Sequence, residues 1–437
     1  MRRIVAGAVV PGYEANGNSA GAKFNKGKLV ERPDGAAAWR WNMGGSPRVH
    51  VHKTTTSSDA MRRRRFMQAS MATVGGFLLA SCNEPASTPF GTSTHSRDDA
   101  SDGQRWVMPD ERNPHTRTWM AFGASERIWG ARLLPQVRRD LILIAATIAR
   151  FELVSMLVRP EEMDQARGLI GAANIELIAA PVDDLWMRDT GPVFVKGDSG
   201  CGGVDFNFNG WGGKQEHRRD TSVSGFVAGR AGVQTVHTDL VLEGGGIEVD
   251  GQGSAIITES CVLSENRNPG RAKRDVEAEL DRVLGITKVI WLPGIAGHDI
   301  TDGHTDFYVR FAGPGVVVAG LDTDPKSFDY DVTRRHLDTL HSATDAHDRQ
   351  LQVEVIEGPA TVREKFDNDD FAAGYINFYV CNGAVIAPEF GDPDSDSAAK
   401  ATLERLFPDR QVVQLNIDAI AAGGGGIHCT TQQEPAR

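Results

Sequence analysis

Cysteine is scarce in this sequence, and the few cysteines are far apart. Five occur among 437 residues, and they are Cys82, Cys201, Cys261, Cys381 and Cys429. Such a small number excludes a disulfide framework, and none of the residues shows the paired C-x-x-C spacing of a structural zinc site. The odd count is compatible with unpaired thiols.

The sequence also lacks an excess of positive charge. It contains 47 lysines and arginines against 58 acidic residues, which gives a net charge of -11. This balance argues against a nucleic acid as the partner and suits a small cationic ligand. The hydrophobic content of 40% and the charged content of 24% are ordinary for a globular protein. We find no fixed-period repeat.

The N-terminal third of the sequence shows an abrupt change in composition. Residues 1–60 have no sustained apolar period, whereas a basic run begins at Met61 and a short apolar stretch at 72–80 ends in Leu-Ala-Ser-Cys82. The apolar stretch is much shorter than the roughly 20 residues that span a membrane, so this order is typical of a secretory signal. A basic amphipathic arm is the alternative interpretation.

These features predict four segments. Residues 61–82 resemble a twin-arginine export signal that ends in a lipobox, with Cys82 as the lipidated mature N-terminus of a cell-envelope, periplasmic or extracytoplasmic lipoprotein. Residues 1–60 are then an over-extended gene start or a disordered extension, with Met61 as the true initiator. Residues 83–104 form a flexible, polar tether to the membrane. Residues 105–437 form the folded domain.

Helix and strand patterns alternate along this domain. Because no linker interrupts the alternation, the sequence predicts a single α/β domain. Helices are predicted at 131–150, 271–284, 332–340 and 397–406. Strands are predicted at 152–158, 175–180, 288–292, 315–319, 351–356, 375–380, 384–387 and 411–415.

Four polar clusters lie in glycine-containing segments. The clusters are Asp183–Pro192, Leu242–Gly246, Asp302–Phe311 and the tail Gly423–Gln433. If the third is extended, His304 and Asp306 project to the same face, since side chains alternate along a strand. Taken singly, each cluster has a plain structural explanation: a capped turn, a hydrogen-bonded core histidine, an exposed hairpin or a flexible tail.

Together the clusters supply one thiol, one imidazole and several carboxylates. Paired carboxylates hold a planar guanidinium through charge-assisted bonds. A thiolate can attack its central carbon while an imidazole carries the protons. The combination therefore favours the hydrolysis of a guanidinium group.

The same segments resemble a known family. Along residues 105–435 the sequence is similar to the agmatine deiminase / bacterial-type (Porphyromonas-type) peptidylarginine deiminase family of the guanidine-modifying superfamily. The matching motifs are Trp119–Phe122, Trp186–Pro192, Phe206–Lys214, Leu242–Gly245, Glu265–Pro269, Thr301–Asp306, Asn377–Tyr379, Phe390–Pro393 and the tail with Cys429.

The resemblance implies a fold and a set of roles. The fold is a five-bladed, pseudosymmetric α/β propeller with the site at its centre, and no metal or organic cofactor is needed. The implied catalytic residues are Cys429 as nucleophile, His304 as general acid and base, and Asp189 and Asp306 as the carboxylates that grip the guanidinium. The implied substrate-binding residues are Trp186, Asp189, Asp306, Glu243 and Arg188.

The expected reaction converts a guanidinium group into a ureido group and ammonia through a Cys-bound intermediate. Agmatine, giving N-carbamoylputrescine, is the first expectation, with peptidylarginine or free arginine close behind. The chain has Gly426 where agmatine enzymes usually carry asparagine, and Asp299 or Asp302 would have to meet the free amine. The alternatives are an amidinotransferase and a non-catalytic exported lipoprotein that binds cationic ligands. The sequence does not predict an oligomeric state.

Overall fold

A computed structural model describes residues 30–31, 37–38, 104–171 and 173–437. The chain divides into two compact units, Met1–His95 and Ser96–Arg437. In the first unit β1 (Val30–Glu31) pairs antiparallel with β2 (Ala37–Ala38). The predicted export signal at 61–82 with Cys82, all of the tether but Gln104, and most of the 1–60 extension lie outside the described residues.

In the second unit, the described residues repeat one small arrangement of strands and a helix, and each copy is called a module. In each of its five sheets the first strand is antiparallel to the second, a helix follows, and the third strand returns parallel to the second. The helix is needed because parallel neighbours require a crossover connection. Two of the sheets carry one additional edge strand.

The five modules are numbered by the order of their crossover helices along the chain. The first contains β19 (Gln432–Pro435), β4 (His115–Phe122), α2 (Glu126–Ile148), β5 (Leu153–Val158) and the edge strand β6 (Ile175–Ala179); the second contains the edge strand β3 (Trp106–Val107), β7 (Val193–Gly197), β8 (Gly200–Asp205), α6 (Val223–Ala231) and β9 (Gln234–His237). The third contains β10 (Ile247–Val249), β11 (Ser254–Thr258), α8 (Lys273–Leu284) and β12 (Lys288–Leu292). The fourth contains β13 (Val309–Gly313), β14 (Val316–Leu321), α9 (Asp329–Ser342) and β15 (Gln352–Glu357); the fifth contains β16 (Tyr379–Cys381), β17 (Ala384–Glu389), α10 (Pro393–Leu406) and β18 (Gln411–Asn416).

Short helical segments connect these elements. The α-helical ones are α3 (Met163–Leu169), α4 (Met187–Thr190), α5 (Gly210–Gly213), α7 (Glu259–Val262) and α11 (Asp418–Ala421). The 3-10 turns are η2 (Pro160–Glu162), η3 (Asp220–Ser222), η4 (Gly244–Gly246), η5 (Thr305–Phe307) and η6 (His428–Thr430).

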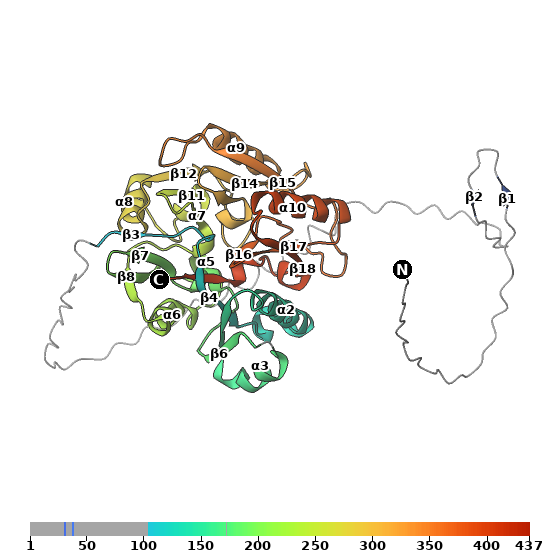
Figure 1. The fold of residues 1–437 in the computed structure, drawn as a ribbon, viewed down its shortest axis with the longest axis horizontal. Coiled ribbons are helices and arrows are strands. Elements are labelled where there is room, and N and C mark those ends of the chain that lie inside the picture. Colours follow the sequence, from blue (N-terminus) through green and yellow to red (C-terminus); the bar gives the residue numbers. More distant parts are fainter. Residues whose placement is uncertain (1–29, 32–36, 39–103, 172) are drawn as a thin grey trace, which may run out of the picture. The chain divides into compact units, whose positions relative to one another are not determined.

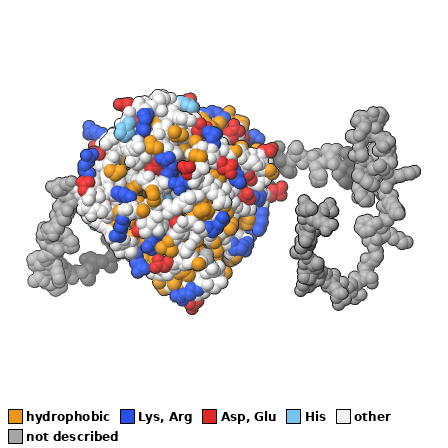
Figure 2. All heavy atoms as spheres, viewed as in Figure 1, with side chains coloured by type: hydrophobic (Ala, Val, Ile, Leu, Met, Phe, Trp, Pro, Cys, Tyr) orange, Lys and Arg blue, Asp and Glu red, His pale blue; other side chains and the backbone are white. Residues whose placement is uncertain are grey.

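The five sheets surround the middle of the domain in chain order, with the helices on the outside (Figure 1). The C-terminal strand β19 closes the ring by pairing antiparallel with β4, with Gln432 opposite Trp119. This is the five-sheet α/β arrangement that the resemblance implied. On the face drawn in Figure 2, acidic and basic side chains are interspersed, and hydrophobic ones are scattered between them.

Local sequence explains most of the elements. Helix α8 buries Val276, Leu280 and Val283 along one face and ends at Gly285, whose φ of 70° suits glycine. Strand β11 is buried along its whole length, as its apolar run indicates. Among the described residues, no helix combines the length and the apolar character that crossing a bilayer requires.

Two expectations about local structure are wrong. The strand predicted at 375–380 begins only at Tyr379, because the preceding residues form a turn in which the Asn377 amide N–H donates to the carbonyl of Gly374. The segment after His304 is not extended, because residues 305–307 form η5, with the Tyr308 N–H donating to the Thr305 carbonyl at 2.8 Å. In both places the backbone turns where its side chains enter the centre of the ring.

Candidate active site

Five residues of the site occupy equivalent positions in the five modules. Each lies just before the first strand of a sheet: Asp189 before β7, Glu243 before β10, Asp306 before β13, Asn377 before β16 and Cys429 before β19. Since the sheets surround one centre, the segments that lead into their first strands meet there (Figure 1). The clusters that the sequence analysis separated by long intervals therefore form one site.

Gly245 shows how tightly the side chains converge. A Cβ atom added to Gly245 would lie 2.6 Å from His304 Nδ1, 2.9 Å from Asp189 Oδ1 and 3.1 Å from Asp306 Oδ2. The Gly245 N–H also donates to Asp189 Oδ1 at 3.1 Å. A residue without a side chain is required at this point, because any other would displace the surrounding polar groups.

The imidazole of His304 lies between two carboxylates. Its Nε2 is 3.2 Å from Glu243 Oε2, and its Nδ1 is 3.8 Å from Asp189 Oδ1. Burial opposes protonation of the ring, but Asp189, Cys261 and Glu243 outweigh burial and raise the pKa of His304 well above its ordinary value. These neighbours favour the charged ring, which can donate a proton.

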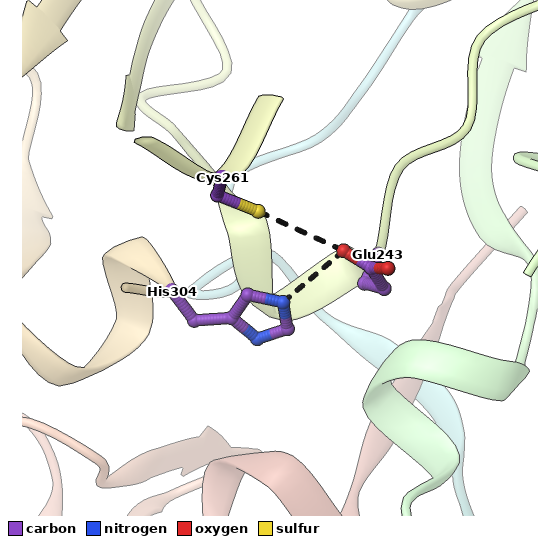
Figure 3. Close-up of side chains that lie close together, drawn as sticks. All are labelled: Glu243, Cys261 and His304. Atoms are coloured by element: carbon purple, nitrogen blue, oxygen red, sulfur yellow. Dashed lines mark hydrogen bonds and ion pairs between the residues drawn. The ribbon is translucent and has the colours of Figure 1, made fainter. Parts of the chain in front are cut away.

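Glu243 is fully buried, and its carboxylate is fixed from two sides. Arg267 Nε donates to its two oxygens at 2.9 and 3.0 Å, and Cys261 Sγ lies 3.7 Å from Oε2 (Figure 3). Burial alone would raise the pKa of Glu243, but His304 and Arg267 lower it. The exposed-hairpin interpretation of this segment is excluded.

Cys429 is held at the centre by an amide. Its Sγ lies 3.3 Å from Asn377 Nδ2 and 3.7 Å from Asp306 Oδ2, and its backbone N–H donates to Asn377 Oδ1 at 3.3 Å. Burial, together with the carboxylates of Asp306 and Asp189, raises the pKa of the Cys429 thiol well above its usual range. The four cysteines in the described part of the chain are all unpaired, in agreement with the sequence analysis.

The two aspartates differ in their surroundings. Burial raises the pKa of Asp189 to about 6, although Trp211 Nε1 donates to its Oδ2 at 2.9 Å. Burial would also raise the pKa of Asp306, but a hydrogen bond with His428, 2.7 Å between Nδ1 and Oδ2, helps to lower it. Asp306 Oδ1 is buried and has no hydrogen-bond partner among the described residues, so it can accept from a ligand.

Two tryptophans contact the glycine-rich tail. A Cβ atom at Gly425 would lie 2.2 Å from the Trp186 ring, and one at Gly423 would lie equally close to Trp129. The two indole rings are 5.7 Å apart between centroids. The tail needs glycine here because the rings pack directly on its backbone, and the same contact places Trp186 close to the Cys429 segment.

Arg188, which the resemblance implied as a substrate-binding residue, makes its hydrogen bonds within the protein. Its guanidinium donates to Glu111 Oε2 at 3.1 Å, to Gln432 Oε1 at 2.6 Å and to Gln433 Oε1 at 2.8 Å, and its Nε donates to the His428 carbonyl. All three nitrogens are therefore used within the protein. We assign Arg188 to positioning the Cys429 segment and not to contacting substrate.

Sequence reasoning overlooked Glu111, Asn377 and His428. Glu111 accepts from Arg188, Arg310 and the Val380 N–H, and also lies 2.9 Å from His428 Nε2. Nothing in the local sequence around Glu111 indicates this role. Asn377 was detectable as a polar residue inside an apolar stretch, and His428 as the neighbour of the candidate nucleophile.

The two aspartates considered for a substrate amine are already engaged. Asp302 Oδ2 accepts from Arg267 at 3.0 Å and pairs with Lys214 at 2.7 Å. Asp299 accepts from the backbone of Thr301 and from that of Gly303 within its own loop. Both carboxylates stabilise the loop before His304.

Comparison with known proteins identifies the family of this chain. Residues 107–435 match the model of the family described as Porphyromonas-type peptidyl-arginine deiminase. A Streptomyces coelicolor protein provisionally named agmatine deiminase is 42% identical over 75% of this chain and 98% of its own, and the agmatine deiminase of Pseudomonas fluorescens is 36% identical over 75% and 95%.

A solved structure extends the agreement to the fold. The agmatine deiminase of Enterococcus faecalis, captured while catalysing its reaction, is 32% identical, and the match covers 76% of this chain and 96% of that one with a TM-score of 0.72. The sequence match, the shared fold and the central cluster of thiol, imidazole and carboxylates lead to one assignment. The chain belongs to the Porphyromonas-type peptidyl-arginine deiminase family, whose agmatine deiminase members it resembles along nearly their whole length.

Proposed function

We propose that this protein hydrolyses the guanidinium group of agmatine to N-carbamoylputrescine and ammonia. The convergence of His304, Asp189 and Asp306 around Gly245, with Cys429 Sγ 3.7 Å from Asp306, carries the proposal. Agmatine is the first choice of substrate because the relatives that match along almost their whole length carry that activity in their names.

Asp189 and Asp306 act as the guanidinium clamp. Each has a carboxylate oxygen at the convergence point, and Asp306 also offers the unpartnered Oδ1. A guanidinium donates through planar N–H groups, which match carboxylate oxygens in geometry and charge. The clamp orients the substrate so that its central carbon faces the sulfur.

Binding of the cation prepares the nucleophile. The same two carboxylates that raise the pKa of Cys429 are neutralised when the guanidinium enters, so the thiol loses its proton to solvent as substrate binds. The thiolate then forms a C–S bond to the guanidinium carbon, and the charged imidazole of His304 donates its proton to the departing nitrogen. Ammonia leaves, and an amidino group remains on Cys429.

Water completes the reaction. His304, now neutral, removes a proton from a water molecule that attacks the same carbon, and the C–S bond breaks to release the ureido product. Glu243 fixes the imidazole through Nε2 and stabilises its charged form, so the ring can serve as acid and then as base. In total, the agmatine cation and one water give N-carbamoylputrescine and an ammonium ion.

The test incubates the full chain separately with agmatine, free arginine and an arginine-containing peptide. We expect ammonia and ureido product from agmatine, no product from the Cys429→Ala variant, and unchanged turnover by Cys201→Ala, which removes a partly exposed thiol of β8. Turnover of the peptide alone would show that peptidylarginine, and not agmatine, is the substrate. A folded protein with a reduced thiol and no turnover of any substrate would contradict the proposed reaction and favour a cation-binding protein.

We also propose that residues 61–82 direct export and that Cys82 is lipidated. The order of basic, apolar and Leu-Ala-Ser-Cys segments supports this. In bacterial cells with a twin-arginine system, replacement of all four arginines at 62–65 by lysine should keep the protein in the cytoplasm, while Cys82→Ala should remove the lipid mass from the mature protein. Membrane association that survives Cys82→Ala without an attached lipid would contradict the proposed anchor.

A further inference from the structure

A second buried thiol lies behind the candidate general acid. Figure 3 shows the side chains of Cys261, Glu243 and His304 directed toward one another. Their ligand atoms all lie within 4.8 Å of one another, and each residue is at most 2% exposed. The proposed reaction uses Glu243 and His304 but has no use for Cys261.

We propose that these three residues form an inhibitory site for a thiophilic divalent cation such as Zn²⁺. Thiolate, imidazole and carboxylate are the ligand types that zinc takes in proteins, and three protein ligands leave one position for water. The site would bind the metal at the Nε2 atom of His304, on the opposite side of the ring from Asp189.

Two of the three separations between the ligand atoms are close to those around a tetrahedral ion. Usual zinc–ligand lengths place an imidazole nitrogen and a carboxylate oxygen about 3.3 Å apart, and a thiolate sulfur and a carboxylate oxygen about 3.5 Å apart. The observed separations are 3.2 Å between His304 Nε2 and Glu243 Oε2 and 3.7 Å between Cys261 Sγ and the same oxygen. The third pair of ligand atoms, Cys261 Sγ and the ring nitrogen of His304, lies within 4.8 Å.

The charge balance is also favourable, despite the nearby guanidinium of Arg267. Cys261 Sγ donates to Glu243 Oε2, and the charged ring of His304 carries a second proton on Nε2, which lies 3.2 Å from the same oxygen. Both protons leave when the metal binds, because its ligands must be deprotonated at the binding atom. A divalent cation thus replaces two protons, and the net charge beside Arg267 is unchanged.

Occupation of this site would stop the proposed reaction without involving Cys429. A metal on Nε2 replaces the proton on that nitrogen, so the hydrogen bond between His304 and Glu243 is lost and the ring can no longer form the charged imidazolium. His304 would then no longer act as acid and base. Binding of the metal does not depend on the proposed reaction; only its inhibitory effect does.

The test uses Co²⁺ as a spectroscopic probe in the full chain carrying Cys429→Ala, so that the candidate nucleophile cannot be the ligand. We expect a thiolate-to-cobalt charge-transfer band that Zn²⁺ displaces. The band should disappear when Cys261→Ser is added and persist when Cys381→Ser, a change at another buried thiol, is added instead. Near-ultraviolet circular dichroism shows whether each variant is folded.

The affinity for Zn²⁺, measured by competition with a chromogenic zinc chelator, should fall by more than about 100-fold in the Cys261→Ser background, since loss of a ligand exceeds the loss of an outer-shell partner. With the other cysteines intact, the constant for inhibition of turnover by Zn²⁺ should weaken in Cys261→Ser in parallel. Absence of the band in Cys429→Ala, or its persistence in the folded Cys261→Ser variant, would overturn the metal site. Absence of agmatine turnover with the band present would overturn only the proposed reaction.

Discussion

At the scale of single residues, Cys429 is a thiol in a negatively charged setting. Burial and the carboxylates of Asp306 and Asp189 oppose its ionisation. A resting thiol is unreactive toward water and oxidants, because the thiolate is the nucleophile. The site therefore couples reactivity to the arrival of a cation.

This setting predicts slow alkylation of the free enzyme. The rate of Cys429 modification by iodoacetamide, followed by peptide mass spectrometry, should keep rising above the ordinary thiol pKa of about 8.5. Asp306→Asn removes a negative charge beside the sulfur, which lowers the thiol pKa, so modification at pH 8 should become about tenfold faster for each unit of pKa lost. A plateau below pH 7 in the unmodified sequence would contradict the prediction.

The pKa of Asp189 should determine how kcat/KM falls at acidic pH. Its pKa of about 6 means that the clamp loses one negative charge as the pH falls through that value. Because kcat/KM reports ionisations of the free enzyme, kcat/KM for agmatine should fall about tenfold per pH unit below pH 6. A profile that stays flat down to pH 5 would show that this carboxylate is not needed in its charged form.

Asn377 predicts an effect on geometry. Its side-chain amide contacts both the sulfur and the backbone N–H of Cys429, so Asn377→Ala removes two hydrogen bonds that position the nucleophile. We expect kcat to fall about 10- to 100-fold with a smaller change in KM, since small misplacements of a reacting group have effects of that size. The control is Asn174→Ala, whose side chain only donates to the Ala149 carbonyl on the surface. Equal loss of activity in the control would contradict the assignment.

At the scale of elements, the glycines of η4 let three polar side chains approach one backbone. Gly245→Ala should reduce kcat/KM by more than about 100-fold, because the added methyl would lie 2.6 Å from His304 Nδ1 and displace the ring. The matched change Gly225→Ala lies in α6, where an added Cβ meets nothing within 4 Å. It should retain activity and raise the free energy of unfolding by about 0.5–1 kcal/mol. Denaturant titration and steady-state kinetics measure both effects.

The elements themselves were predictable to different degrees. Helix α8 and strand β12 lie within two residues of their predicted ranges, because their periodicity and flanking residues act locally. The turns η5 and η6 were not predicted, since their backbone follows the contacts of His304, Asp306 and Cys429 at the centre. The sequence supplied the catalytic candidates only as a set of residue types, and the structure brings these residues together.

At the scale of the whole molecule, strand β19 completes both the ring and the site. It pairs with β4, its Glu434 accepts from Trp119 Nε1 at 2.9 Å, and Gln432 with Gln433 accepts from Arg188. The strand begins three residues after Cys429. The pairing of β19 with β4 therefore closes the ring of sheets and also positions Cys429.

Removal of residues 432–437 should consequently abolish activity and greatly reduce stability. The deletion leaves the buried Arg188 without two acceptors and exposes an edge of β4, so we expect the free energy of unfolding to fall by at least about 3 kcal/mol. Removal of Arg437 alone takes away one contact to the Ala231 carbonyl and should cost only about 1 kcal/mol. Similar stability of the two truncated chains in denaturant titrations would contradict this account of ring closure.

The sequence by itself determined the helices and strands with clear local patterns, such as α8 and β12, and the inventory of thiol, imidazole and carboxylates, which needs no geometry to be counted. The tertiary structure decided which of these groups meet. Cys429 reaches Asp306 across 123 residues of chain, and Glu111 joins Arg188, Arg310 and His428 although no local pattern marks it. The physical reason is that these contacts exist only once five sheets surround a common centre, and no segment of the chain encodes that closure alone.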